Sequence, residues 1–160
     1  MNRQSDRCAL LDQFNHTISA LIDVVREITD LENEKASIAS SGHHVLIDEC
    51  IKKEQACILK LRGLEHKRMR AAEPLGWKDL TFRQILEQCE DSEAESLQPL
   101  FSELDNRIDQ LLNARDSADR IIRSRLQEME LLLSRQTGES YDGTGKGSSG
   151  IEVHLHDQFV

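Results

Sequence analysis

The sequence contains few of the residues that interrupt helices or build β-sheets. Aromatic residues make up only 4% of the 160 residues, and the chain has two prolines. With few β-branched runs as well, the composition favours an all-helical protein. No segment approaches the ~20 consecutive apolar residues that a membrane-spanning helix requires, so we expect no stable membrane insertion. The N-terminal segment turns polar too soon for a signal peptide, and we therefore expect a cytoplasmic protein.

Clustered positive charge is also lacking. The formal net charge is −9, whereas nucleic-acid binding requires a clustered positive surface that neutralises phosphates. The nearest approach to such a cluster is residues 52–70, where Glu54 and Glu65 stand among the lysines. The charge pattern therefore predicts no nucleic-acid partner.

The patterns that catalytic and metal sites require are missing too. The four cysteines are scattered without a CxxC pair, which excludes a disulfide framework and favours buried apolar roles. His43 and His44 have no companion cysteine at ligand spacing, and His154 and His156 need a third ligand to hold a metal. The glycine-rich GTGKGSSG lacks the ending of a P-loop, and no nucleophile is paired with a base. We expect no catalytic residue, metal site or cofactor, and hence no enzyme.

A heptad repeat of apolar residues occupies the first part of the chain. Its seam consists of Leu11, Phe14, Ile18, Leu21, Val25 and Ile28. This spacing predicts a helix over residues 6–40. The small residues of SSGHH predict a turn, with Ser40 or Ser41 capping the next helix. A second helix is predicted over 43–72, in which Glu54 occupies a seam position and either reaches solvent or pairs with a lysine.

The stretch EPLGWKDLTFRQ interrupts the helical pattern and holds the only tryptophan. Pro74 disfavours helical backbone in the residue before it, and Gly76 allows a tight reversal of the chain. The stretch Thr81–Gln84 has the form of a capping box at the start of a short helix, predicted over 81–91. We predict that Trp77 is buried against the ends of the long helices, where the chain crosses between them.

The last helix carries a surplus of apolar surface. Pro99 suits a first helical turn, so this helix is predicted to begin near Gln98 and to end near Ser134. Toward its end the apolar stripe broadens to include Ile121, Ile122, Leu126, Met129, Leu131, Leu132 and Leu133. Such a surplus either contacts something outside the bundle or packs against the start of the first helix.

The C-terminal segment has a different composition. Residues 136–150 are rich in glycine and contain no aliphatic residue, so they bury too little to offset their ordering entropy and are predicted to be flexible. The final IEVHLHDQFV alternates apolar and polar residues, and either folds on a partner or remains a tail. We therefore predict an all-α fold: an antiparallel bundle of three long helices with a short connecting helix over residues 1–135, and a flexible C-terminal tail over 136–160.

Four stretches carry a family resemblance: EKASIASSGHHVLIDECIKKEQACILKLRGLEHKR, LGWKDLTFRQIL, LLNARDSADRII and SYDG. Their order, over about residues 10–145, resembles the FlgN-type flagellar export chaperones. The family commonly has two asparagines three residues apart in its last helix, where this chain has Asn113 followed by Asp116.

The resemblance implies a chaperone that binds hook-associated (hook–filament junction) proteins through their C-terminal helical segment and keeps them unassembled until secretion. It implies a client-binding surface made of Ile121, Ile122, Leu126, Met129, Leu132 and Leu133. It also implies that Tyr141 contacts the flagellar export gate or helps to order the tail. We expect a monomer or weak dimer on this interpretation. Two alternatives stay open, namely a self-associating coiled-coil structural or adaptor protein and a metal- or ligand-binding four-helix sensor.

Overall fold

The computed structural model describes residues 3–137 of the chain. The elements in order are α1 (Arg3–Ser41), α2 (Val45–Ala72), the 3₁₀ turn η1 (Glu73–Leu75), α3 (Phe82–Gln88) and α4 (Asp91–Thr137). No strand occurs within residues 3–137. The predicted all-α bundle of three long helices with a short connecting helix is therefore confirmed. Helix α4 ends two residues inside the predicted tail, and the rest of that tail lies outside the described residues.

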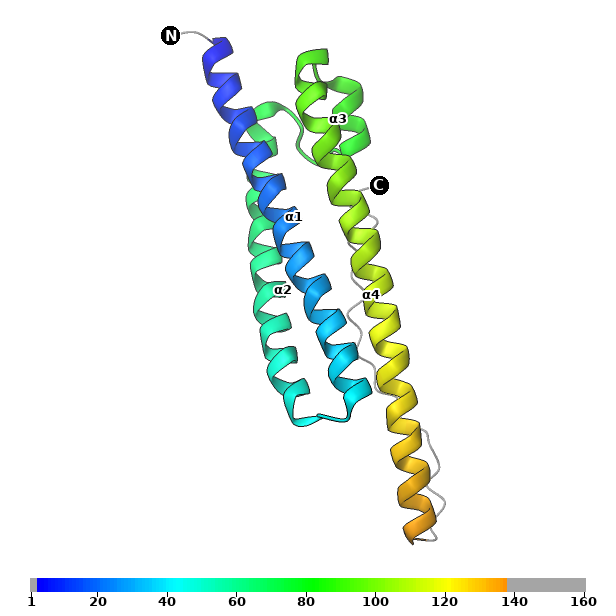
Figure 1. Ribbon diagram of the computed structural model, residues 1–160. Helices are drawn as coiled ribbons and strands as arrows, with labels where there is room; N and C mark the ends of the chain where they lie inside the picture. Colours follow the sequence, from blue (N-terminus) through cyan, green and yellow to red (C-terminus); the bar gives the residue numbers. More distant parts are fainter. Residues whose placement is uncertain (1–2, 138–160) are drawn as a thin grey trace.

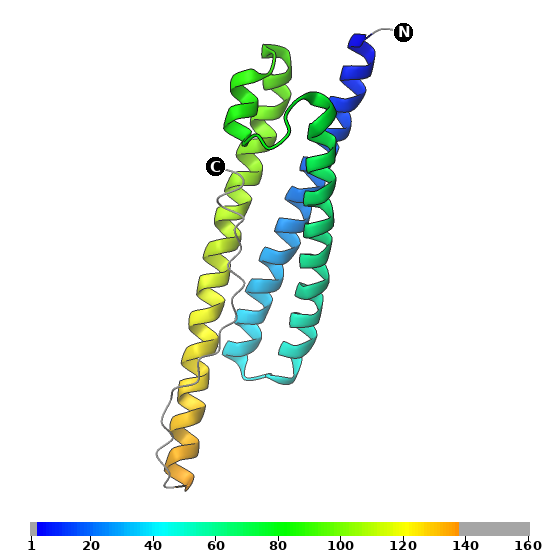
Figure 2. The same cartoon turned by 180° about the vertical axis from the view of Figure 1, so that it is seen from behind.

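Helix α1 lies between the other two long helices and contacts both of them (Figure 1). Helix α2 runs antiparallel to α1, whereas α4 starts beside the beginning of α1 and runs parallel to it (Figure 2). Two contacts agree with this parallel register. Arg7 pairs with Glu93 near the start of both helices, and Arg125 donates to the Ser40 carbonyl near the end of α1. Because α4 is the longer helix, its last turns extend past the α1–α2 turn.

The core follows the heptad seam of α1. Every seam residue from Phe14 to Ile28 is buried, and Leu11 is partly buried, which confirms the prediction from periodicity. Helix α4 contributes a matching row of buried residues, namely Leu97, Phe101, Leu104, Ile108 and Leu111. Burying a large apolar side chain stabilises a fold by about 1.5–3 kcal/mol, so these two rows supply much of the driving force.

The break around Pro74 has the predicted geometry. Helix α2 gives way to η1, and Gly76 then adopts φ +82°, with its N–H donating to the Glu73 carbonyl at 3.0 Å. This left-handed conformation is one that residues with a Cβ rarely adopt. Trp77 is 3% exposed, and its ring meets the Phe14 ring edge-on with centroids 5.4 Å apart. The predicted burial of Trp77 is therefore confirmed.

The capping box is confirmed as well. Thr81 Oγ1 accepts from the Gln84 N–H at 3.2 Å, and Gln84 Oε1 accepts from the Thr81 N–H at 2.9 Å. The helix that follows, α3, is shorter than predicted because Cys89 already has extended backbone (φ −75°, ψ 162°). The chain then enters α4 almost at once.

The predicted cap of the second helix is wrong. Ser41 is still part of α1, and its hydroxyl donates back to the Ile38 carbonyl at 3.0 Å. Gly42 turns the chain with φ +78°, so the cap position falls on His44, whose side chain makes no capping bond. The turn is thus set by the glycine rather than by a serine cap.

The predicted start of the last helix near Gln98 is also wrong, because α4 begins at Asp91. The Glu93 carboxylate accepts the Glu90 N–H at 3.2 Å and so satisfies an amide at the helix start. Pro99 lies inside α4 on its exposed side, where its missing N–H removes one helical hydrogen bond away from the core. Burial of the apolar residues on the other side holds the helix together.

Candidate partner-binding surface

The last turns of α4 project beyond the rest of the bundle (Figure 1). We call Leu126, Met129, Leu132 and Leu133 the terminal stripe. These side chains are between 44% and 59% exposed. Ile121 and Ile122, which the sequence placed in the same surface, are half-buried where α4 leaves the bundle. The start of α1 lies at the opposite end of the molecule, so the interpretation that this stripe packs there is wrong.

The terminal stripe continues the core-facing side of α4. Ile122 and Met129 lie four and eleven residues after the buried Ala118. Leu126 and Leu133 lie four and eleven residues after Ile122, and such steps return to the same helical face. Leu131 is equally exposed but lies two residues from Leu133, on the far side of the helix. The same side that packs on α1 therefore runs on past the end of α1.

Polar contacts fix the base of this projecting end. Arg125 Nη2 donates to the Ser40 carbonyl at 2.8 Å, and Arg125 Nη1 donates to Glu128 at 3.1 Å. Val45 and Leu46 are also exposed, at the start of α2 and at the same end of the bundle. Sequence reasoning missed both residues, because they lie outside the apolar face of their helix. The available signal was their place directly after the glycine turn.

A buried ionic cluster joins α1 to α2. Lys35 Nζ lies 3.1 Å and 3.0 Å from the two carboxylate oxygens of Glu32, and 2.9 Å from Glu54 Oε2. Burial raises the pKa of Glu32 to about 7, with the neighbouring Glu54 carboxylate adding to the shift. Although burial opposes it, hydrogen bonds with Glu32 and Lys35 lower the pKa of Glu54. Of the two alternatives predicted for Glu54, the structure therefore shows pairing with a lysine.

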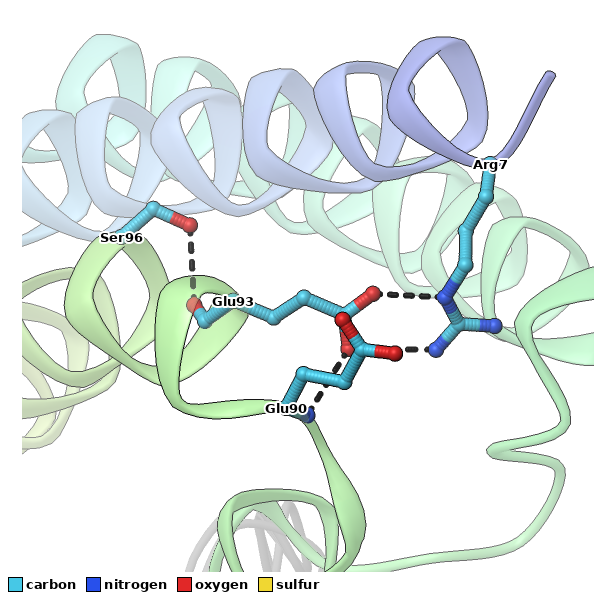
Figure 3. A network of polar contacts seen from close by, with 4 residues as sticks. All are labelled: Arg7, Glu90, Glu93 and Ser96. Atoms are coloured by element: carbon cyan, nitrogen blue, oxygen red, sulfur yellow. Dashed lines mark hydrogen bonds and ion pairs between the residues drawn. The ribbon is translucent and has the colours of Figure 1, made fainter. Parts of the chain in front are cut away.

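A second ionic network holds the start of α4 against α1 (Figure 3). Arg7 Nε and Nη2 donate to the two Glu93 carboxylate oxygens at 2.6 Å and 3.1 Å. Ser96 Oγ donates to the Glu93 carbonyl at 2.9 Å. The hydrogen bond from Arg7 lowers the pKa of Glu93, so the pair stays ionised at neutral pH. The Arg7 guanidinium also lies 5.7 Å from the centre of the Trp77 ring. Both networks position helices and contain no arrangement typical of catalysis.

Other predicted groups have mixed outcomes. Cys50 is buried and Cys57 and Cys89 are partly buried, but Cys8 is exposed, so the expected burial fails there. Within residues 3–137 no group of three or more metal-ligating side chains comes together. Tyr141 and the histidine pair at 154 and 156 lie outside the described residues. None of the helices in the described part of the chain is long and apolar enough to cross a membrane.

Comparison with known protein families places this geometry in context. The family model described as FlgN protein matches residues 1–148. The chain belongs to the FlgN family. Membership implies a flagellar chaperone role, and the FlgN match covers all the described helices as well as the exposed end of α4. No curated protein and no solved structure matched the chain.

Proposed function

We propose that this FlgN-family chain is a cytoplasmic flagellar export chaperone that binds hook-associated proteins through their C-terminal helical segment. The observation that carries the proposal is the terminal stripe, an exposed continuation of the core-facing side of α4 beyond the bundle. Monomeric soluble proteins rarely expose a contiguous apolar surface of this kind unless it binds a partner. Family membership supplies the chaperone class.

The chemistry of the client follows from the shape of the stripe. An apolar row on a single projecting helix suits an amphipathic helix whose own apolar face packs along it, with residues spaced by three and four as anchors. Arg125 and Glu128 flank the row and offer charges of both signs at its edge. Covering the client's apolar face in this way delays its assembly until secretion. We expect a one-to-one complex.

Client release then requires no nucleotide chemistry. The stripe is narrow, so binding buries few side chains and the affinity stays moderate enough for hand-over at the export gate. Met129 suits such a reversible contact, because an unbranched thioether side chain adapts to different packing partners. By family resemblance, Tyr141 contacts the export gate or orders the segment around it.

The test replaces Met129 and Leu133 together by glutamate. Both side chains are exposed, so the fold should tolerate the change, whereas a bound client would desolvate two unpaired charges. We expect affinity for the C-terminal segment of a hook-associated protein to fall by about a hundredfold or more, with unchanged helicity by circular dichroism. Leu131→Glu is the matched control, because Leu131 is exposed on the other side of the same helix. Equal loss in the control would contradict the proposal.

A self-associating coiled coil is the second candidate, because the exposed row on α4 also suits another copy of the chain. Light scattering on the purified protein separates the two functions. The chaperone interpretation expects a monomer or weak dimer without client. A stable elongated oligomer of the wild type, together with a monomeric Met129→Glu, Leu133→Glu variant, would favour self-association.

A further inference from the structure

A basic surface covers the outer side of α2, although the chain as a whole carries a net charge of −9. Its cations, all exposed, are Lys52, Lys53, Lys60, Arg62, Lys67 and Arg70. We call this surface the α2 basic face. The two carboxylates in the same interval are only partly exposed. Glu54 forms an ion pair with Lys35, and Glu65 forms one with Arg68. No exposed acidic residue therefore lies between Lys52 and Arg70.

Most of this positive charge is uncompensated. Lys53 and Lys60 make long ion pairs of 3.5 Å and 3.4 Å with exposed carboxylates. Exposed pairs of this kind contribute little to stability and break easily when a better partner binds. Within the described part of the chain, Lys52, Arg62 and Lys67 form no ion pair, and the same holds for Arg70. The face is therefore available to an acidic partner.

The centre of the face is shaped for close approach. Ala56, Leu59 and Gly63 follow one another along the helix at steps of three and four residues, between the cations at either end. Leu59 is 66% exposed. A Cβ added at Gly63 would meet no atom within 4 Å, so packing inside the bundle does not require glycine there. Glycine inside a helix is destabilising relative to alanine, so the fold alone gives no reason for a glycine at this position.

We propose that the α2 basic face docks an acidic amphipathic helix of a partner protein. The face is about 27 Å long at 1.5 Å per residue, which matches a helix of five turns. Leu59 contacts the apolar row of the partner, and Gly63 lets the two backbones approach closely. Lys53, Lys60 and Lys67 on one flank and Arg62 on the other pair with carboxylates of the partner, as the flanking positions of coiled coils do. This surface is on a different helix from the terminal stripe, so a client and this second partner bind together.

The same features argue against other anionic partners. Helices that lie on membranes insert several large apolar side chains, whereas Leu59 is the only large apolar residue in the centre of this face. Nucleic acid extends its phosphates well beyond a face of this length and would meet the acidic remainder of a chain whose total net charge is −9, whereas a short helix is confined to the face. A narrow row with a glycine at its centre suits a helix better than a lipid surface or a phosphate backbone.

The probe for this proposal is a designed helical peptide of about 21 residues, with alanine and leucine along its seam and glutamate on both flanks. A peptide with lysine at the flanks serves as the comparison. In fluorescence anisotropy at low salt, we expect the full-length protein to bind the glutamate peptide more tightly than the lysine peptide by about tenfold or more. The affinity should fall as salt is added, because exposed charges are screened.

Two variants test which surface is responsible. Changing Lys52, Arg62, Lys67 and Arg70 to glutamate should weaken binding of the glutamate peptide by about tenfold or more. Reversing two exposed cations elsewhere, Arg26→Glu in α1 and Arg83→Glu in α3, should leave it within about twofold. Gly63→Gln should keep or raise the melting midpoint and still weaken peptide binding by about fivefold, since it blocks close approach.

The outcomes decide the proposal in either direction. Loss of peptide binding in both α2 variants, with the control unchanged, supports it. Full binding by both α2 variants, or no binding of the glutamate peptide by the wild type, overturns it. Binding to phosphatidylglycerol vesicles or to duplex DNA that disappears on charge reversal, without peptide binding, would assign the face to a membrane or a nucleic acid instead. The Met129→Glu, Leu133→Glu variant should bind the peptide like the wild type, which keeps this test separate from that of client binding.

Discussion

Replacing Glu32 by glutamine should remove a pH dependence that the buried cluster builds into the fold. Glu32 is 1% exposed and shares Lys35 with Glu54. Its pKa rises from 4.5 to about 7, because burial disfavours the charged form. A raised pKa means that the folded state holds this proton more tightly than the unfolded state. The stabilisation of the fold by protonated Glu32 is therefore complete below the pKa that Glu32 has in the unfolded chain, and it is lost as pH rises through about 7.

The size of the effect follows from that shift. At 1.36 kcal/mol per pKa unit, a change from 4.5 to about 7 corresponds to roughly 3 kcal/mol of unfolding free energy at most. Glu54 and Glu93 have lowered pKa values, so their stabilisation is present above their unfolded pKa of 4.5 and is lost only as pH falls below it. The window between pH 4.5 and about 7 therefore reports on Glu32. Glutamine keeps the shape of the protonated side chain and cannot ionise.

The assay is urea unfolding followed by circular dichroism at several values between about pH 5 and pH 8. We expect the unfolding free energy of the wild type to fall as pH rises and that of Glu32→Gln to fall less. Across this pH range, the unfolding free energy of the variant should therefore rise relative to that of the wild type by up to about 3 kcal/mol. Glu34→Gln, at an exposed position of α1, is the matched control and should follow the wild type. Parallel pH profiles for wild type and Glu32→Gln would refute the reasoning.

Three further outcomes are expected. Trp77→Ala should lower the unfolding free energy by roughly 3–5 kcal/mol, as truncation of a buried aromatic does, and wild-type Trp77 should emit at shorter wavelength than free tryptophan; an unchanged urea midpoint would contradict its burial. Pro99→Ala should raise stability by about 1–3 kcal/mol, because it restores a helical N–H, and a fall in the melting midpoint would mean that the proline is needed in place. Removing residues 138–160 should leave the melting midpoint within a few degrees of the full chain; global unfolding would show that bundle and tail are not separate units.

Local patterns predicted those features of the fold that local physics determines. The heptad seam, the reversal at Gly76 and the capping box at Thr81 each depend on residues within one or two helical turns. The surplus of apolar residues near Met129 could be predicted from the sequence for the same reason. Its position outside the bundle was not, because that depends on α4 running parallel to α1 and outlasting it.

Errors arose where distant residues decide the outcome. Pro99 suggested a helix start near Gln98, but Arg7, far away in the sequence, pairs with Glu93 and holds the earlier start of α4 in place. Glu54 and Glu65 seemed to interrupt the positive charge of residues 52–70, yet in the fold they pair with Lys35 and Arg68 and leave the outer face basic. The sequence alone does not show which side of such a helix is covered by other helices, so the charges of its exposed side could not be separated from those of its covered side.

The central claim is that clients lie along the terminal stripe, and site-specific photo-crosslinking tests it most directly. A photoreactive amino acid is placed at Met129 in one protein and at Leu131 in another, both exposed on the same turn of α4 but on opposite sides. Each protein is mixed with the C-terminal segment of a hook-associated protein and illuminated. We expect strong crosslinking from position 129 and little from position 131. Equal crosslinking from both positions, or none from position 129 while the segment still binds, would contradict it.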